Sequence, residues 1–333
     1  MMMNEIVYPT IMSGKKLLYV HGFGSSGSSG TVARIRELLP SATVIAPDLP
    51  LHPAEAMDLL NNVCQTEKPD LIIGTSMGGM YTEMLYGYDR ILVNPAFQMG
   101  ETMIKHGRLG INTFLNPRKD GVQEFYVTKP LVEEYKEISK KCFSQITTDE
   151  MTRVYGLFGD NDDVVDTREL FSTHYSNDIS FHGGHRLNDK TLIHSVVPVI
   201  RWIDDKQEGR ERPLVYIDIE TLRNKHGEQM PSAMKAFRLL LENYNVFVVA
   251  DAPMGYQDYY KQVAEWVLDI VNVPAWQHLV FTSHKDILYG DYLIDTTDNV
   301  NESDFLGTQI VLGGDTFKTW DDIIEFFSRL GGQ

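Results

Sequence analysis

Cysteine is scarce in this chain of 333 residues, with Cys64 and Cys142 as the only two. Two cysteines cannot build a disulfide framework, and their positions match no metal-ligand spacing. We therefore expect no structural disulfide, which is the usual state of a protein kept in a reducing compartment.

Basic residues are also in short supply, because 30 Lys and Arg stand against 46 Asp and Glu and leave a formal net charge of −16. Proteins that bind phosphate backbones or anionic lipid surfaces need clustered Lys and Arg. The charge balance therefore argues against a nucleic-acid partner.

Long apolar runs are missing, and no segment approaches the roughly 20 residues that span a bilayer. The stretch from Met1 to Lys16 has neither the basic head nor the apolar centre of a secretory signal. We expect a cytoplasmic protein with no membrane span.

Its 333 residues suggest two domains, since one domain usually holds roughly 150. The pattern specifies no oligomeric state.

Short apolar runs alternate with amphipathic helix-length segments over the first 200 residues, a pattern typical of a parallel sheet wrapped by helices. The expected strands are 16–20, 42–46, 70–74, 90–93, 153–158 and 178–181. Between about 96 and 150 the rhythm breaks, and an insertion of this kind commonly forms a lid over a site. We expect a helical lid whose apolar side chains either line an acyl pocket or form a small core.

A polar stretch at 204–212 has no apolar residue and ends at Pro213, so it reads as an exposed linker. We place an α/β domain at 1–203 and a second, smaller Rossmann-like α/β domain at 213–333. The second domain is expected to hold strands at 214–219, 246–250, 279–282 and 292–294, with helices at 233–243 and 259–271.

The run Gly74-Thr75-Ser76-Met77-Gly78-Gly79 directly follows an apolar strand and precedes a helix-like segment. A G-x-S-x-G sequence in this setting is the nucleophile elbow of the α/β-hydrolase fold. Small residues are needed because the turn is tight, and the serine hydroxyl then projects above the sheet. Ser76 is the candidate nucleophile.

A serine hydroxyl needs a histidine to remove its proton, and the histidine needs a carboxylate to orient it. In this fold the chain order is serine, acid, histidine. Asp160, Asp162 and Asp163 follow the fifth strand, and Asp162 is preferred among the three. His182 and His185 follow the sixth strand. His185 is preferred, because the two glycines before it let the loop fold back.

The loop His21-Gly22-Phe23-Gly24-Ser25-Ser26 follows the first strand, where one amide of an oxyanion hole is expected. Phe23 N–H and Met77 N–H are the candidate donors. With Ala46-Pro47-Asp48, His52-Pro53-Ala54, the elbow and Val93-Asn94-Pro95, this loop resembles the YqiA/YcfP-like esterase family over about 14–203. The resemblance implies an α/β-hydrolase acting on fatty acyl esters or thioesters without a cofactor, its serine, aspartate and histidine falling on Ser76, Asp162 and His185.

The strand Val215-Tyr216-Ile217-Asp218-Ile219-Glu220 and the run from Ser283 to Asp295 resemble the 5′(3′)-deoxyribonucleotidase branch of the haloacid dehalogenase-like phosphatases. The resemblance implies that Asp218 attacks phosphorus, that Lys285 holds phosphate, and that Asp218 and Asp295 bind Mg²⁺. Glu220 replaces the family's general acid, Ala250 replaces its phosphate-binding hydroxyl residue, and about thirty residues between Asp218 and Ala250 leave no room for a cap. We expect a vestigial site in a capless domain.

Three functions compete on these observations. The first is an ester or thioester hydrolase working through acyl-Ser76, and the second is a magnesium-dependent phosphohydrolase centred on Asp218. The third is an interaction protein in which neither site turns over. The acyl group itself leaves no signal in the sequence.

Overall fold

A computed structural model describes residues 7–271, 278–296 and 305–330 of the chain. The chain divides into two compact units, Met1–Gln207 and Glu208–Gln333, here called the first and the second unit. No helix in the described part of the chain combines the length and apolarity needed to cross a membrane. Cys64 and Cys142 are free thiols.

The first unit is built on a six-stranded parallel sheet in the order β2-β1-β3-β4-β7-β8. The strands are β1 (Lys16–Val20), β2 (Thr43–Ile45), β3 (Leu71–Thr75), β4 (Asp89–Val93), β7 (Val154–Gly159) and β8 (Asp178–Phe181). All six strands expected from the sequence are present to within one residue at each end. Their apolar runs form a central sheet because side chains on both faces are buried.

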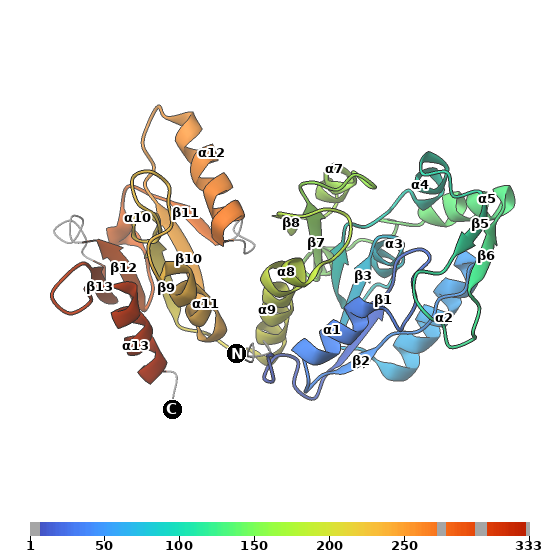
Figure 1. Ribbon diagram of the computed structural model, residues 1–333, viewed down its shortest axis with the longest axis horizontal. Coiled ribbons are helices and arrows are strands. Elements are labelled where there is room, and N and C mark those ends of the chain that lie inside the picture. The colour runs from blue at the N-terminus through green and yellow to red at the C-terminus, as the bar shows by residue number, and fades with distance from the viewer. Residues whose placement is uncertain (1–6, 272–277, 297–304, 331–333) are drawn as a thin grey trace. The chain divides into compact units, whose positions relative to one another are not determined.

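Helices cover both faces of this sheet (Figure 1). Leu17, Tyr19 and the alternate residues of the neighbouring strands pack against α1 (Gly30–Leu38), the π-helical turn η1 (Leu192–Val196) and α9 (Val197–Glu208). Leu18, Val20 and Ile72 face the other way, toward α2 (Pro53–Glu67), α3 (Met77–Glu83) and α5 (Lys129–Ser139). The period-two alternation of a strand thus builds two cores from one sheet. The short helices α7 (Arg168–Ser172) and α8 (Asp189–Thr191) flank β8.

The insertion between β4 and β7 is not wholly helical. It holds α4 (Met99–Lys105), α5, α6 (Thr148–Met151) and an antiparallel pair, β5 (Gly110–Thr113) and β6 (Glu124–Val127). The sequence did not predict this pair, because Ile111 and Tyr126 face each other across it and both are exposed. The insertion does line the cavity described below.

The expected linker at 204–212 is wrong in its first half, because α9 continues to Glu208. Asp204 is buried there, and its Oδ1 accepts a hydrogen bond from Lys15 Nζ at 2.7 Å. The sequence suggests that the Asp204 carboxylate is solvated, but Lys15, near the beginning of the chain, holds it in place.

The second unit contains a five-stranded parallel sheet in the order β11-β10-β9-β12-β13. The strands are β9 (Leu214–Asp218), β10 (Asn245–Ala250), β11 (Leu279–Phe281), β12 (Tyr292–Thr296) and β13 (Thr308–Leu312). One face packs on α10 (Ile219–Leu222), α11 (Ala233–Asn243), α12 (Gln257–Trp266), η2 (Val267–Val271) and α13 (Trp320–Leu330). Between β9 and β10 lie only α10, α11 and their connections. β13 and α13 were not predicted.

Candidate active site

Ser76 occupies the turn between β3 and α3 with an unusual backbone, φ 55° and ψ −120°. A non-glycine residue with positive φ stores strain, which surrounding contacts must offset. Here the Ser76 amide donates to Val93 O at 3.0 Å, and its carbonyl accepts from Gly79 N at 2.9 Å and Ala96 N at 2.9 Å. A side chain at Gly78 would lie 2.0 Å from Val20 O, so only glycine fits there.

Ser76, His185 and Asp162 form one continuous chain of hydrogen bonds. His185 Nε2 lies 2.9 Å from Ser76 Oγ, and His185 Nδ1 lies 2.8 Å from Asp162 Oδ2. The three residues follow β3, β8 and β7, so all stand at the carboxyl edge of the sheet, where α/β proteins place their sites. The structure brings together the three residues that the sequence singled out.

Asp162 is held as a carboxylate. Its Oδ1 accepts from the amides of Val164 at 2.8 Å and Val165 at 3.0 Å. Burial alone would raise its pKa, but the hydrogen bonds from His185 and these amides outweigh burial and keep the pKa below its ordinary value. Asp162 therefore stays ionised and fixes the His185 ring with a proton on Nδ1.

The neighbouring candidates form a separate pair. His182 Nδ1 lies 2.8 Å from Asp160 Oδ2, and the Gly183 amide donates to Asp160 Oδ1 at 3.0 Å. The His182 and Asp160 side chains are 49% and 33% exposed, against 15% and 6% for His185 and Asp162. This exposed pair shapes the loop and has no hydrogen bond to Ser76.

Asn94 joins the loops that carry the acid and the histidine, a role that the sequence did not reveal. Its Nδ2 donates to Gly184 O at 3.0 Å and to His185 O at 3.2 Å, and its Oδ1 accepts from Gly159 N at 2.8 Å. Asn94 has φ 44°, a conformation that asparagine tolerates better than most residues. Its place after β4, beside the elbow, was the only available signal.

The loop after β1 packs directly on the nucleophile, since a Cβ on Gly22 would lie 3.3 Å from Ser76 Cβ. His21, only 3% exposed, fixes this loop. Its Nδ1 donates to Gly22 O at 2.9 Å, and its Nε2 accepts from Leu49 N at 3.1 Å. Burial, partly offset by the bond to Gly22, lowers the pKa of His21. His21 is therefore a neutral structural residue.

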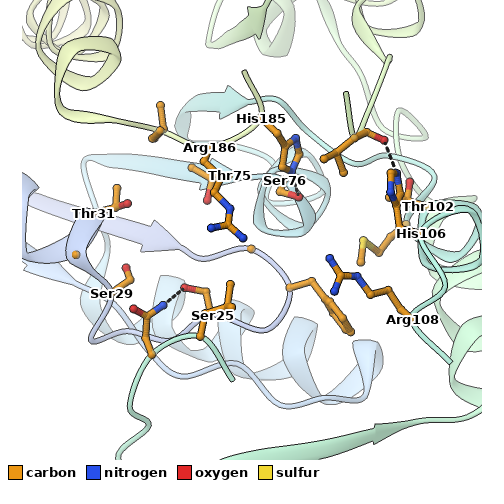
Figure 2. A pocket seen from close by; sticks show the side chains of 18 of the residues that line it. Ser25, Ser29, Thr31, Thr75, Ser76, Thr102, His106, Arg108, His185 and Arg186 are labelled. Atoms are coloured by element: carbon orange, nitrogen blue, oxygen red, sulfur yellow. Dashed lines mark hydrogen bonds between the residues drawn. The ribbon is translucent and has the colours of Figure 1, made fainter. Parts of the chain in front are cut away.

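Ser76 and His185 open into a cavity of about 610 Å³ (Figure 2). Phe23 and Gly22 from the loop after β1, Ser29 and Thr31 from the start of α1, and residues of the insertion line its walls. Met77 lies at the first helical position of α3, where an amide has no carbonyl partner within its own helix. The amides of Phe23 and Met77 thus come from segments that flank Ser76.

In the second unit, Lys285 bridges Asp218 and Asp295. Lys285 Nζ lies 2.5 Å from Asp218 Oδ2 and 3.0 Å from Asp295 Oδ2. Asp218 is the last residue of β9, Asp295 belongs to β12, and Lys285 begins the 3₁₀ turn η3 (Lys285–Ile287). Burial, reinforced by Asp295 and opposed by Lys285, raises the pKa of Asp218 to about 6.

Glu220 does not join this cluster as a proton donor. Its carboxylate is 47% exposed and lies 3.3 Å from Arg223 Nη2 on the same helical turn. Its amide, rather than its carboxylate, contacts Asp218, donating to Oδ1 at 2.8 Å. Ala250, at the end of β10, offers only backbone groups there.

The phosphatase resemblance implies Mg²⁺ at Asp218 and Asp295. The described ranges contain no group of three or more His, Cys, Asp or Glu side chains that could hold a metal. The Asp218 and Asp295 carboxylates both contact the Lys285 ammonium.

The profile of the uncharacterised protein family UPF0227 matches residues 16–191, more than half of the chain. The chain belongs to this family. A UPF0227 protein of Shewanella baltica is 27% identical over 192 residues, which are 51% of this chain and 92% of that protein. The solved structure of Est1E from Butyrivibrio proteoclasticus is similar over 60% of this chain and 90% of the Est1E chain, with a TM-score of 0.39 and 16% identity.

Residues 220–324 match the profile of the 5′ nucleotidase, deoxy (pyrimidine), cytosolic type C protein. A protein of Vibrio phage KVP40, provisionally named a 5′(3′)-deoxyribonucleotidase, is 25% identical over 129 residues, 38% of this chain and 71% of the phage protein. One of the same provisional name from Staphylococcus aureus is 32% identical over 116 residues, and this chain spans 61% of its length. Both resemblances expected from the sequence are confirmed.

Proposed function

We propose that this protein is a serine hydrolase that cleaves carboxyl esters or thioesters through an acyl-Ser76 intermediate. The observation that supports it most is the hydrogen-bonded chain from Ser76 Oγ through His185 to Asp162, opening into the cavity of about 610 Å³. A hydroxyl with such a base beside it, and room for a ligand in front, is the arrangement that acyl transfer requires.

In the first half of the reaction, His185 Nε2 removes the proton from Ser76 Oγ as the oxygen attacks the carbonyl carbon. The negative charge that develops on the carbonyl oxygen is held by the amides of Phe23 and Met77, and one such donor is worth about 3 kcal/mol in comparable sites. The carbon–oxygen or carbon–sulfur bond then breaks, and the alcohol or thiol leaves with the proton from His185.

In the second half, a water molecule gives its proton to His185 Nε2 and attacks the acyl-enzyme carbonyl. Collapse of this intermediate releases the acid and returns the proton to Ser76 Oγ. Asp162 stays ionised throughout and stabilises the positively charged His185 ring in both halves. No metal or organic cofactor enters these steps.

Covalent labelling tests this proposal. A fluorophosphonate probe should label the wild-type protein at Ser76, and Ser76→Ala should lose both the label and the hydrolysis of a neutral nitrophenyl ester. Ser25 lines the same cavity and has an Asn116 side chain rather than a histidine as its partner. Ser25→Ala should therefore keep the label. Hydrolysis retained by Ser76→Ala would overturn the assignment.

We further propose that the second unit does not turn over phosphate esters and contributes through its fold or surface. This is supported by the Glu220 carboxylate lying against Arg223, and by the capture of both Asp218 and Asp295 by Lys285. Phosphoryl transfer needs a well-placed proton donor as well as charge neutralisation, and a displacement of about 1 Å can cost about a hundredfold.

A further inference from the structure

The cavity in front of Ser76 is positively charged in an acidic protein. The chain carries 46 acidic and 30 basic residues, yet the 20 residues that line the cavity include no Asp or Glu. They do include Arg108 and Arg186. The Asp162 carboxylate is engaged with His185. A ligand in this cavity therefore meets an excess of positive charge.

Arg108 and Arg186 also differ from the other arginines of the first unit, which holds nine. Five of the others pair with carboxylates, one donates to a backbone carbonyl, and one lies over an aromatic ring. The five that pair with carboxylates are Arg34, Arg90, Arg118, Arg153 and Arg168. Arg36 donates to the carbonyl, and Arg201 lies over the ring. Neither Arg108 nor Arg186 has a side-chain partner within the described ranges. A guanidinium group carries five donors in a planar fork suited to carboxylate or phosphate.

The two side chains enter the cavity from different walls. Figure 2 shows both guanidinium groups directed into the space beside Ser76, Arg186 from the His185 loop and Arg108 from the segment after α4. Arg186 directly follows His185, so the contacts that place His185 also place Arg186. The amide of Arg108 donates to Met103 O at 2.9 Å, which ties it to the end of α4.

His106 ties the segment after α4, which carries Arg108, to the loop after β7, which carries Asp162. Its Nε2 lies 3.1 Å from Val164 O, and a carbonyl can only accept, so Nε2 carries the proton. Val164 is also one of the two residues whose amides hold Asp162. The wall that carries Arg108 is thus tied to the loop that carries the acid. The cavity is also lined by apolar side chains, among them Phe23, Met99, Met103, Leu115 and Leu187, and by hydroxyl and amide side chains such as Ser29, Thr31 and Asn116.

We propose that the substrate is an anionic ester or thioester, whose carboxylate or phosphate group is bound by Arg108 and Arg186 while its scissile carbonyl lies at Ser76. This inference rests on the proposed function of Ser76 and adds the charge of the substrate. The apolar side chains of the cavity contact the carbon chain between the two groups. A neutral ester reaches Ser76 but leaves both guanidinium groups to water.

Paired substrates test the proposal. The first set consists of nitrophenyl esters of one chain length, ending in a methyl group, a carboxylate or a phosphate, so that the two anions are distinguished. A second pair, phenyl acetate and acetylated hydroxybenzoate, places the charge on the leaving group. We expect wild-type kcat/KM to be about tenfold higher for an anionic member of one set, corresponding to about 1.4 kcal/mol.

The variants Arg108→Gln and Arg186→Gln should each lower kcat/KM for the preferred anionic ester by about fivefold to tenfold, and change the neutral ester less than about twofold. Arg153 pairs with Asp149 and does not line the cavity. Arg153→Gln removes the same charge and should leave the preference unchanged. Raising the salt concentration should shrink the preference, because screening weakens exposed ion pairs.

The outcomes separate this inference from the proposed function. Fluorophosphonate labelling of Ser76 with equal hydrolysis of neutral and anionic esters would overturn the anionic substrate alone. The same holds if both arginine variants keep the wild-type preference. Absence of both labelling and hydrolysis would overturn the role of Ser76 and this inference with it.

Discussion

Ser76 in the first unit and Asp218 in the second each stand at the end of a buried parallel strand, yet their surroundings differ. Ser76 has His185 on one side and an open cavity on the other. The Asp218 carboxylate is buried, and one of its oxygens is bonded to Lys285. In both cases the parallel sheet places the candidate nucleophile at its carboxyl edge. Whether such a residue can react depends also on a base or acid within hydrogen-bond distance, and on whether its own oxygen is accessible to a substrate.

The largest expected effect concerns the two histidines of the loop after β8. His185→Ala should lower kcat/KM for a nitrophenyl ester about 10⁴-fold or more, because the base that activates Ser76 is lost. His182→Ala, which removes the exposed partner of Asp160, should cost less than about threefold. The comparison of initial rates checks this, and an equal loss in both variants would contradict the assignment of the base.

The two carboxylates of the loop after β7 give the next contrast. Asp162→Asn should lower kcat about 10³-fold to 10⁴-fold, because an amide no longer holds the His185 ring in the required tautomer. Asp160→Asn is the matched control and should stay within a few-fold of wild type. Rates measured alongside a thermal unfolding curve separate chemistry from folding. If Asp160→Asn proves the more damaging change, Asp162 is not the acid.

A smaller loss is expected at Asn94, which bridges the loops after β7 and β8. Asn94→Ala removes the contacts to Gly159 N, Gly184 O and His185 O. Displacement of His185 by about 1 Å can cost about a hundredfold, so kcat should fall between about tenfold and a hundredfold with little change in KM. Asn94→Asp keeps only the bond from Gly159 and should rescue little.

A purely structural role for Asn94 predicts a different result. Its substitution would then lower the unfolding temperature without slowing fluorophosphonate labelling of the protein that remains folded. Labelling kinetics well below the unfolding transition distinguish the two roles.

The smallest expected effect is a dependence of stability on pH that comes from His278 in the second unit. Burial lowers the pKa of His278, in the second unit, to about 4, against about 6.5 in an unfolded chain. The unfolded state therefore binds the proton more readily. The stability that His278 contributes is present above about pH 6.5 and is lost as pH falls toward 4, by about 2 kcal/mol at pH 5.

Replacement of His278 by a residue that does not titrate should remove this dependence. His278 stacks on Phe247 at 4.6 Å between ring centroids, so His278→Phe keeps an aromatic ring there. Denaturant unfolding followed at pH 5 and pH 7.5 measures the difference. An unchanged pH dependence in His278→Phe would contradict this account of the second unit.

Much of the fold and of the site was predictable because the signals are local. Buried parallel strands read as apolar runs, and the elbow is a short motif in a strand–turn–helix setting. Two loop glycines favoured His185 over His182, whereas no local signal distinguished Asp162 from Asp160 and Asp163. Of Gly159, Gly183 and Gly184, Gly159 has the least room, because a Cβ there would lie 2.4 Å from Gly183 O and hold the two loops apart.

The features that were missed depend on distant residues. The bonds of Asn94 span 65 to 91 positions, and nothing near it in the sequence encodes them. Asp204 looks solvated until Lys15 is found beside it. The β5–β6 pair carries exposed apolar side chains, so its sequence lacks the alternation of apolar and polar residues that marks a half-buried strand. That Arg108 and Arg186 have no side-chain partner among the described residues likewise appears only when their neighbours are in place.

The most direct test of the contrast between the two units is to measure both activities in one preparation of the full chain. Hydrolysis of a nitrophenyl ester and release of phosphate from deoxynucleoside monophosphates with magnesium should be compared among wild type, Ser76→Ala and Asp218→Asn. We predict ester hydrolysis that Ser76→Ala abolishes and Asp218→Asn leaves intact, with phosphate release near background in all three. Phosphate release at about 1 per second or faster, lost in Asp218→Asn, would contradict the account and make the protein bifunctional.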